Sequence, residues 1–150
     1  MLKLLSPERK GLLVIRVLVV EDHQFFRQCL VDIINASDGL EAVGECGDGC
    51  EVVAAVRDLG PDVVLMDLRL GAMSGLEATA ALHRDQAAAR VLMLTADPAE
   101  SSRSAARVNG AAGYLLKGWG GGVVVRAIRR VAAGGTVWSR ELEPTCTTEF

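Results

Sequence analysis

Polar side chains stand directly at the ends of apolar runs at four points along this sequence. The stretch "VVLMDLRLGAMSG", residues 63–75, is an example, because four apolar residues lead straight to a carboxylate. The residues in question are Glu21 and Asp22 after 14–20, Asp67 after 62–66, Thr95 at the end of 90–95, and Lys117 after 112–116. Singly, each has an ordinary explanation, since carboxylates suit solvated turns, threonine suits strands and lysine suits surfaces.

Together these residues would form a reactive set. Three carboxylates in close proximity raise one another's pKa unless a cation compensates them. Mg²⁺ fits such a site, because it prefers oxygen ligands such as two carboxylates and a carbonyl. An ammonium and a hydroxyl would remain to hold the oxygens of an anion. A nucleophile, a metal, a cation and a hydroxyl are the parts needed for phosphoryl transfer onto a carboxylate.

The elements that must position these side chains alternate between two kinds. Short apolar runs predict buried strands at 14–20, 40–46, 62–66, 90–95 and 112–116. Segments with helical spacing of apolar residues lie between and after them, at 24–35, 50–59, 75–88, 98–109 and 123–133. Five such strand–helix units predict a parallel sheet covered on both faces. Ligands of such sheets bind at the carboxyl ends of the strands, which is where the polar residues stand.

Composition limits the class of protein. The 150 residues suit one domain, and 50% hydrophobic with 4% aromatic residues predicts a core of Val, Leu, Ile and Ala. A net charge of −3 gives no electrostatic basis for binding nucleic acid or an anionic membrane. The arginines at 126, 129 and 130 are explained as a solvated helix face.

Cysteine spacing and hydropathy indicate the compartment. The four cysteines are irregularly spaced and form no metal-binding pattern, so free thiols in a reducing compartment are expected. The first 20 residues weakly resemble a signal peptide, but the polar stretch 7–10 splits their apolar part. No apolar run reaches the length of a membrane span, so a cytoplasmic protein without a membrane partner is expected.

Four motifs carry a family resemblance: "VLVVEDH", "DVVLMDLRLGAMSGLEA", "VLMLTAD" and "GAAGYLLKG". In this order and spacing they resemble the receiver domain of two-component response regulators, over 14–138. The details "EDH", "GYLLK" and "AIRRVAAGG" are most similar to receivers that precede a LuxR/NarL-type DNA-binding domain. The resemblance implies an α/β fold of the flavodoxin-like or CheY-like type, a (βα)5 doubly wound parallel sheet of five strands in the order 2-1-3-4-5.

The resemblance also implies roles for the polar residues. Asp67 would be the phosphoacceptor, supplied by a phosphohistidine on a sensor histidine kinase. Mg²⁺ would be bound by Asp22, Asp67 and the backbone carbonyl of Arg69, and by Glu21 through a water molecule. Lys117 would pair with the phosphoryl oxygens. The protein would be a phosphoacceptor that assists its own phosphorylation and dephosphorylation, and not an enzyme.

Two further residues would form the switch. Thr95 would move to hydrogen-bond the phosphate, and Tyr114 would swing inward behind it. The alternative for Tyr114 is an aromatic side chain half-buried on an edge strand.

Some residues depart from the family pattern. Gly71 stands where proline is usual and should loosen its loop, while Ser74 stands where aspartate is usual but can still cap a helix. The run "GWGGG" at 118–122 should make the last helix begin late and fray. One hypothesis is that Arg69 and Asp97 pair across the mouth of the pocket, and the alternative is two independent exposed charges that contribute little to stability.

Two other functions compete with this interpretation. A dehalogenase-like phosphatase would need a second aspartate two residues after the nucleophile, where this chain has Arg69. A receiver-like module that is never phosphorylated would lack the aspartates or the lysine, which this chain retains.

The two ends of the chain bear on whether the receiver is attached to an output domain. Residues 1–13 are assigned as an N-terminal extension, and 139–150 as a tail or the start of a linker to a missing output domain. A receiver cut from a longer transcription regulator is favoured, so DNA would be bound only through that absent domain. The alternative is a single-domain receiver that acts by protein contact or as a phosphate sink. A homodimer on phosphorylation is expected.

Overall fold

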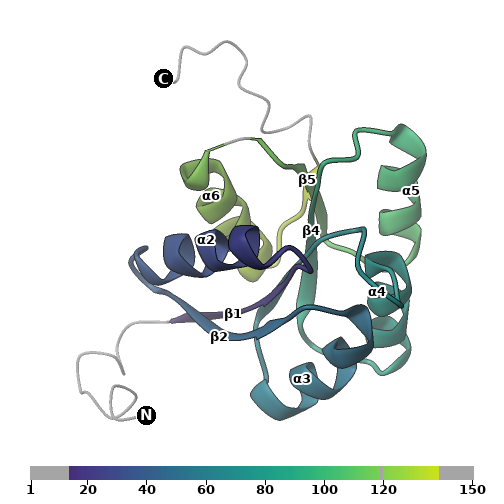
Figure 1. Cartoon of the computed structure of the whole chain (residues 1–150), viewed down its shortest axis with the longest axis horizontal. Coiled ribbons are helices and arrows are strands. Elements are labelled where there is room, and N and C mark those ends of the chain that lie inside the picture. Colours follow the sequence, from purple (N-terminus) through teal and green to yellow (C-terminus); the bar gives the residue numbers. More distant parts are fainter. Residues whose placement is uncertain (1–13, 119, 139–150) are drawn as a thin grey trace.

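Parallel strands form the centre of the molecule, which a computed structural model describes for residues 14–118 and 120–138 (Figure 1). The sheet has the strand order β2-β1-β3-β4-β5-β6, and every pairing in it is parallel. The strands are β1 (Ile15–Val20), β2 (Leu40–Cys46), β3 (Val63–Met66), β4 (Arg90–Thr95), β5 (Gly113–Leu116) and β6 (Val137–Trp138). The predicted α/β class and the order of the first five strands are confirmed. The sixth strand was not predicted, and its two residues pair with Gly113 and Tyr114 of β5.

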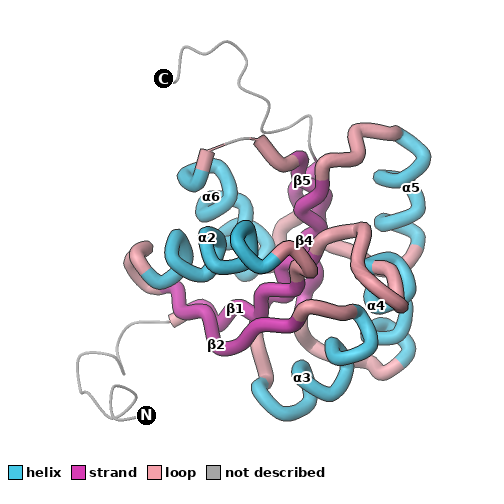
Figure 2. The backbone as a smooth tube through the Cα atoms, in the orientation of Figure 1, coloured by secondary structure: helices cyan, strands magenta, loops and turns pink. Residues whose placement is uncertain are grey.

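Helices connect successive strands, as Figure 2 shows along the backbone. They are α2 (Gln24–Asn35), α3 (Val52–Leu59), α4 (Gly75–Arg84), α5 (Glu100–Val108) and α6 (Gly121–Ala132), with a short 3-10 turn η2 (Gly49–Glu51) before α3. Several expected bounds are wrong. The helix expected over 75–88 ends at Arg84, and the one expected from 123 begins at Gly121. The helices expected from 50 and from 98 begin at Val52 and Glu100.

The helices cover both faces of the sheet, and this explains why the strands are apolar without alternation. In β1, Val17 and Val19 face the cluster that α2 and α6 complete, while Leu18 and Val20 face the cluster completed by α3, α4 and α5 (Figure 1). Successive side chains of a strand point to opposite faces, so a strand buried on both sides must be apolar throughout.

Capping residues determine where helices begin after the loops at the carboxyl edge of the sheet. The N-cap of α2 is His23, whose Nδ1 accepts a hydrogen bond from the backbone N–H of Phe26 at 3.4 Å. Ser74 caps α4 in a reciprocal capping box with Glu77, as its hydroxyl was expected to allow. Gly120 precedes α6 in an extended conformation, so this helix does not begin late, and Trp119 lies outside the described residues.

No helix within residues 14–118 and 120–138 combines the length and the apolar character that a membrane-spanning segment requires. The expected extension at 1–13 and tail at 139–150 lie outside the described residues.

Candidate functional site

The carboxyl edge of the sheet brings three carboxylates together. Glu21 and Asp22 follow β1, Asp67 follows β3, and one ligand oxygen from each lies within 4.8 Å of the others. Glu21 and Asp67 are buried, at 2% and 7% exposed, whereas Asp22 is exposed. Two carboxylates of the cluster are thus shielded from solvent, and the third is accessible to it.

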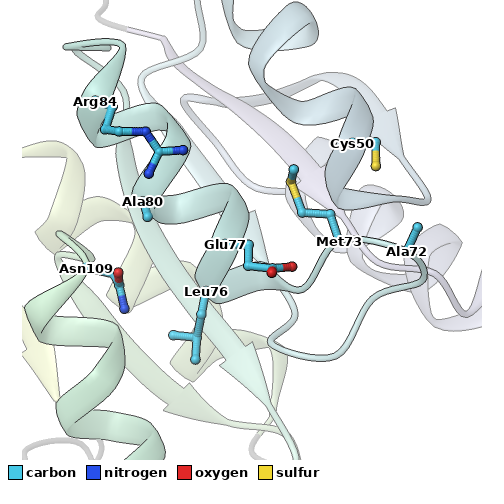
Figure 3. Close-up of a pocket in the computed structure, with 8 residues that line it drawn as sticks. All are labelled: Cys50, Ala72, Met73, Leu76, Glu77, Ala80, Arg84 and Asn109. Carbon is cyan, nitrogen blue, oxygen red and sulfur yellow. The ribbon is translucent and has the colours of Figure 1, made fainter.

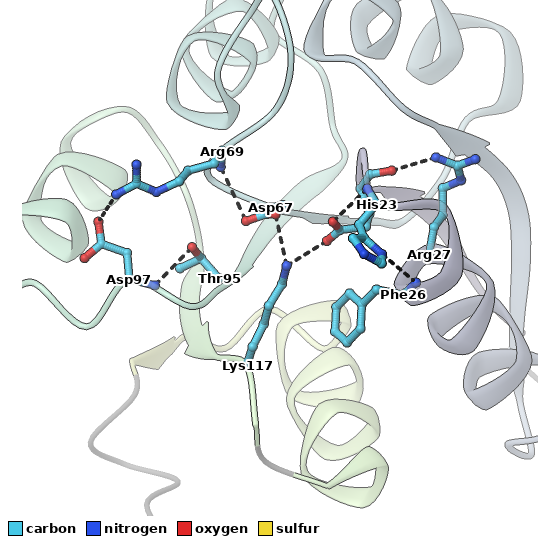
Figure 4. Close-up of polar contacts among 9 residues, drawn as sticks. His23, Phe26, Arg27, Asp67, Arg69, Thr95, Asp97 and Lys117 are labelled. Atoms are coloured by element: carbon cyan, nitrogen blue, oxygen red, sulfur yellow. Dashed lines mark hydrogen bonds and ion pairs between the residues drawn. The ribbon is translucent and has the colours of Figure 1, made fainter.

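Lys117, which follows β5, bridges the two buried carboxylates (Figure 4). Its Nζ lies 3.0 Å from Glu21 Oε1 and 3.0 Å from Asp67 Oδ2. The same ammonium lies 4.5 Å from the centroid of the Phe26 ring. This contact could not be predicted, because the sequence indicates which face of a helix is apolar but not the distance from that helix to a loop after another strand.

Burial and ion pairing have opposite effects on the charges of this cluster. Burial raises the pKa of Glu21, against the opposing effects of hydrogen bonds from Lys117 and the His23 backbone. Burial also works against the charge of Lys117, but hydrogen bonds to Glu21 and Asp67 outweigh it and raise the pKa of this lysine. One ammonium faces three carboxylates, so the cluster keeps an excess of negative charge that favours a further cation.

The loop after Asp67 rests on the turn between β2 and η2. The backbone N–H of Arg69 donates to Asp67 Oδ1 at 3.3 Å. Further along, a Cβ at Gly71 would lie 3.2 Å from Asp48 Oδ2, and a Cβ at Gly49 would overlap the carbonyl oxygen of Met73. Hydrogen bonds from backbone N–H groups, that of Cys50 first and then those of Ala72 and Met73, lower the pKa of Asp48. The loop that lacks the usual proline therefore packs against a neighbouring turn, a contact that the sequence does not indicate.

Helix α4 begins directly against the backbone of Asp67. The N–H of Gly75 donates to the carbonyl of Leu68 at 2.8 Å. A Cβ at Gly75 would overlap the backbone oxygen of Asp67 and lie 3.0 Å from the Leu68 Cα. Only a residue without a side chain fits this approach.

Thr95, Asp97 and Tyr114 form a second group beside the carboxylates. The hydroxyl of Thr95 accepts a hydrogen bond from the Asp97 N–H at 3.3 Å, and the hydroxyl of Tyr114 donates to the Asp97 carbonyl at 2.6 Å. Tyr114 is fully buried. Because β6 pairs with its strand, the alternative of a half-buried aromatic on an edge strand is wrong.

The expected pairing of Arg69 with Asp97 is confirmed, with 3.5 Å between Nη2 and Oδ2 (Figure 4). Asp97 also accepts a hydrogen bond from Ser102 of α5 at 2.7 Å, and this bond is the first cause of its lowered pKa. Asp97 thus connects the loop after Asp67 with the start of α5.

A groove of about 570 Å³ lies elsewhere, between α4, the loop before it and the ends of α5 and η2 (Figure 3). Its lining residues are Cys50, Ala72, Met73, Leu76, Glu77, Ala80, Arg84 and Asn109. Neither the three clustered carboxylates nor Lys117 lines this groove. The groove is therefore separate from the carboxylate cluster at the strand ends.

The family model and the similar proteins all indicate the same family. A model of the response regulator receiver domain matches residues 17–129. The response regulator GacA of Pseudomonas viridiflava is 41% identical over 120 residues, which cover 80% of this chain and 56% of that protein. The nitrate/nitrite response regulator protein NarP of Escherichia coli (strain K12) is 37% identical over 127 residues, covering 85% and 59%. The chain therefore spans less than two thirds of the length of these relatives.

Solved structures agree with the fold. The signal receiver domain of the response regulator NarL from Mycobacterium tuberculosis superposes with a TM-score of 0.79 at 33% identity, covering 81% of this chain and 98% of that one. A LuxR-family two-component response regulator from Aurantimonas sp. SI85-9A1 gives a TM-score of 0.82 at 30% identity, covering 91% and 97%.

Proposed function

The chain belongs to the response regulator receiver domain family, and on this basis we propose that Asp67 accepts a phosphoryl group from a phosphohistidine of a sensor histidine kinase. The observation that carries the proposal is the setting of Asp67. Its buried carboxylate follows β3, lies 3.0 Å from the ammonium of Lys117 and belongs to a cluster of three carboxylates. In the transfer, an oxygen of Asp67 forms a bond to phosphorus while the bond from phosphorus to the histidine nitrogen breaks.

The donor set of the cluster fits Mg²⁺. The clustered atoms are carboxylate oxygens, the hard ligands that this ion prefers. Asp22, Asp67 and the backbone carbonyl of Arg69 would bind it directly, with Glu21 acting through water. When bound, Mg²⁺ neutralises the charge that develops on the transferred group.

The remaining residues hold the phosphoryl group. Lys117 contacts Asp67 Oδ2, and this contact supports the proposal that its ammonium pairs with a phosphoryl oxygen on that carboxylate. The Thr95 hydroxyl accepts the Asp97 N–H in this structure and can turn to donate to phosphate. We assign no enzymatic turnover of a separate substrate to this set, since its product stays covalently attached to the protein until water removes it.

The ion pair of Arg69 and Asp97 is expected to slow that hydrolysis by restricting water at the mouth of the pocket. Arg69→Ala and Asp97→Ala should each speed the loss of phosphate by about twofold to fivefold, the range of an exposed ion pair. The double variant should be no faster than the faster single one. The measurement is a dephosphorylation time course after removal of the phosphate donor.

Ser102→Ala is the matched control for this cycle. It removes the other side-chain partner of Asp97 and leaves Arg69 in place. Fully additive effects of the two charge variants, or an equal acceleration in Ser102→Ala, would show that the pair does not act as a gate.

Phosphorylation should change the surface around α5. Of the nine residues of α5, all of them described, Ala106 is the one that is buried, so this helix buries little area. Movement of Thr95 would break its bond with Asp97, whose carbonyl holds Tyr114 and whose carboxylate holds Ser102. Hydrogen exchange should slow in α5 on phosphorylation and stay unchanged in β1 and β3.

The same sample should move from monomer toward homodimer in sedimentation. Unchanged exchange together with unchanged sedimentation in a fully phosphorylated sample would contradict a switch and support a phosphate sink instead.

We propose that residues 14–138 form the receiver unit of a cytoplasmic transcription regulator, with 1–13 as an extension and 139–150 as a tail or linker. The family match at 17–129 and the lengths of the NarP and GacA relatives support this assignment. DNA would then be bound by a LuxR-type output domain and not by this chain. A single-domain receiver remains the second candidate. Reading the coding sequence beyond Phe150 tests the choice.

A further inference from the structure

The ammonium of Lys117 contacts an aromatic ring as well as two carboxylates (Figure 4). We propose that Phe26 is a positioning residue, whose ring holds the ammonium of Lys117 at the site through a cation–π contact. The inference rests on the proposed function, in which Lys117 pairs with the phosphoryl group. It assigns a role to a side chain of α2 that has no polar atom and no direct contact with the transferred group.

The distance and the surroundings suit such a contact. The Lys117 Nζ lies 4.5 Å from the ring centroid, within the range in which a cation is attracted to a ring face. The lysine side chain is only 23% exposed, so water screens the attraction less than it would at an open surface. Phe26 itself packs against the core cluster between α2, α6 and the sheet.

The ring is fixed to the same backbone as the carboxylates. Nη1 of Arg27, the residue after Phe26, donates to the backbone carbonyl of Glu21 at 2.8 Å. The N–H of His23 donates to Glu21 Oε2 at 3.1 Å, while Nδ1 of His23 accepts from the Phe26 N–H. The first turn of α2 and the end of β1 therefore form one hydrogen-bonded unit, so the backbone that carries the ring is held against Glu21.

The ring gives the ammonium of Lys117 a contact that stays constant during the proposed reaction, which the two carboxylates cannot give. Glu21 and Asp67 are the groups proposed to approach a cation, and Asp67 is the group proposed to become an acyl phosphate. Both contacts of the ammonium therefore change in the course of the reaction, whereas the ring keeps its charge distribution throughout. Lysine has a flexible four-carbon side chain, so a constant contact reduces the number of positions its ammonium samples.

The test compares ring variants in the whole chain. Phe26→Leu keeps an apolar side chain without a ring, and it should lower the maximal rate of phosphorylation by acetyl phosphate and Mg²⁺ about threefold to tenfold. The half-saturating acetyl phosphate concentration should change less. Phe26→Tyr restores a ring face and should recover most of the lost rate. Phe25→Leu is the matched control, because Phe25 precedes it in α2 and is 73% exposed.

Two further comparisons separate positioning from folding. In a Lys117→Ala background, Phe26→Leu should have no additional effect on the rate. A fluorinated phenylalanine inserted at position 26 keeps the size of the ring and weakens its negative face, so the rate should fall as fluorine is added. This variant also decides the matter if Phe26→Leu fails to fold.

A measurement without Mg²⁺ or phosphate donor checks the contact directly. In the NMR spectrum of the wild-type chain, the ring should shift the Lys117 ε-methylene protons upfield, and Phe26→Leu should remove the shift. A wild-type chain that shows the shift but takes up no phosphate would overturn the proposed function and leave the contact standing. A phosphorylated wild type with an unchanged rate in folded Phe26→Leu would overturn the positioning role.

Discussion

Asp67→Asn should abolish phosphorylation of this chain. In the wild type, incubation with acetyl phosphate and Mg²⁺ should raise the intact mass by one phosphoryl group. Asparagine has nearly the same shape and can still accept the Arg69 N–H that now bonds Asp67 Oδ1. It lacks the anionic oxygen that attacks phosphorus, so no mass increase is expected.

The controls for this variant lie among the other carboxylates. Asp22→Ala should suppress the mass increase without moving its site, because it weakens the binding of the cation. Asp85→Asn changes a carboxylate that pairs with Arg57 away from the cluster, and it should leave phosphorylation unchanged. A full mass increase in Asp67→Asn would mean that another side chain is the acceptor.

Among substitutions that add a single methyl group near the site, Gly75→Ala is expected to destabilise the fold most. The new Cβ would overlap the backbone oxygen of Asp67, and backbone atoms cannot move aside as a flexible side chain can. We expect the free energy of unfolding to fall by about 2–4 kcal/mol, toward the upper end for an overpacked position. Urea unfolding of the two proteins measures this difference.

Gly122→Ala is the matched control, since both glycines lie in the first turn of a helix. A Cβ at Gly122 would meet only the Arg126 guanidinium, at 3.8 Å. Alanine favours helix over glycine, so this variant should be neutral or up to about 1 kcal/mol more stable. Equal unfolding midpoints for Gly75→Ala and the wild type would show that α4 can retreat from Asp67 at no cost.

The apolar runs were sufficient to predict the five main strands, because a strand buried on both faces leaves a continuous apolar stretch. They were insufficient for β6. Two residues, Val137 and Trp138, carry no recognisable period, and their strand exists because the chain after α6 returns along β5. The consequence for Tyr114 was therefore missed as well.

The predicted helix ends were wrong where local backbone geometry or packing outweighed the preference of the residue composition. The alanine-rich stretch after Arg84 favours a helix, yet Gln86 adopts a positive φ of 57° and the Ala87 N–H returns to the Leu82 carbonyl. Position 86 carries neither of the usual residues for such a turn, glycine or asparagine. At α6 the glycine run suggested a late start, but Val123 and Val124 are buried, and packing of this face holds the first turn.

The site was predictable to the extent that topology dictates it. Residues that follow parallel strands must meet at one edge, so Glu21, Asp67 and Lys117 could be grouped from the sequence. Contacts made by loops and helix ends could not, because they depend on distances. The approach of the Gly71 loop to Asp48 and the contact of the Phe26 ring with Lys117 are of this kind.

The position of β1 inside the sheet has a consequence for how the chain folds as it is synthesised. Of the strands that the structure describes, β1 is made first, but it pairs on both sides with strands that come later. The backbone N–H of Arg16 donates a hydrogen bond to a carboxylate oxygen of Asp62, 46 residues further on. Contacts between residues so far apart require loop closure before they stabilise anything, which slows folding. During translation β1 must therefore remain without its β3 partner until β3 has left the ribosome, and its apolar side chains are exposed to chaperones and to other nascent chains in that interval.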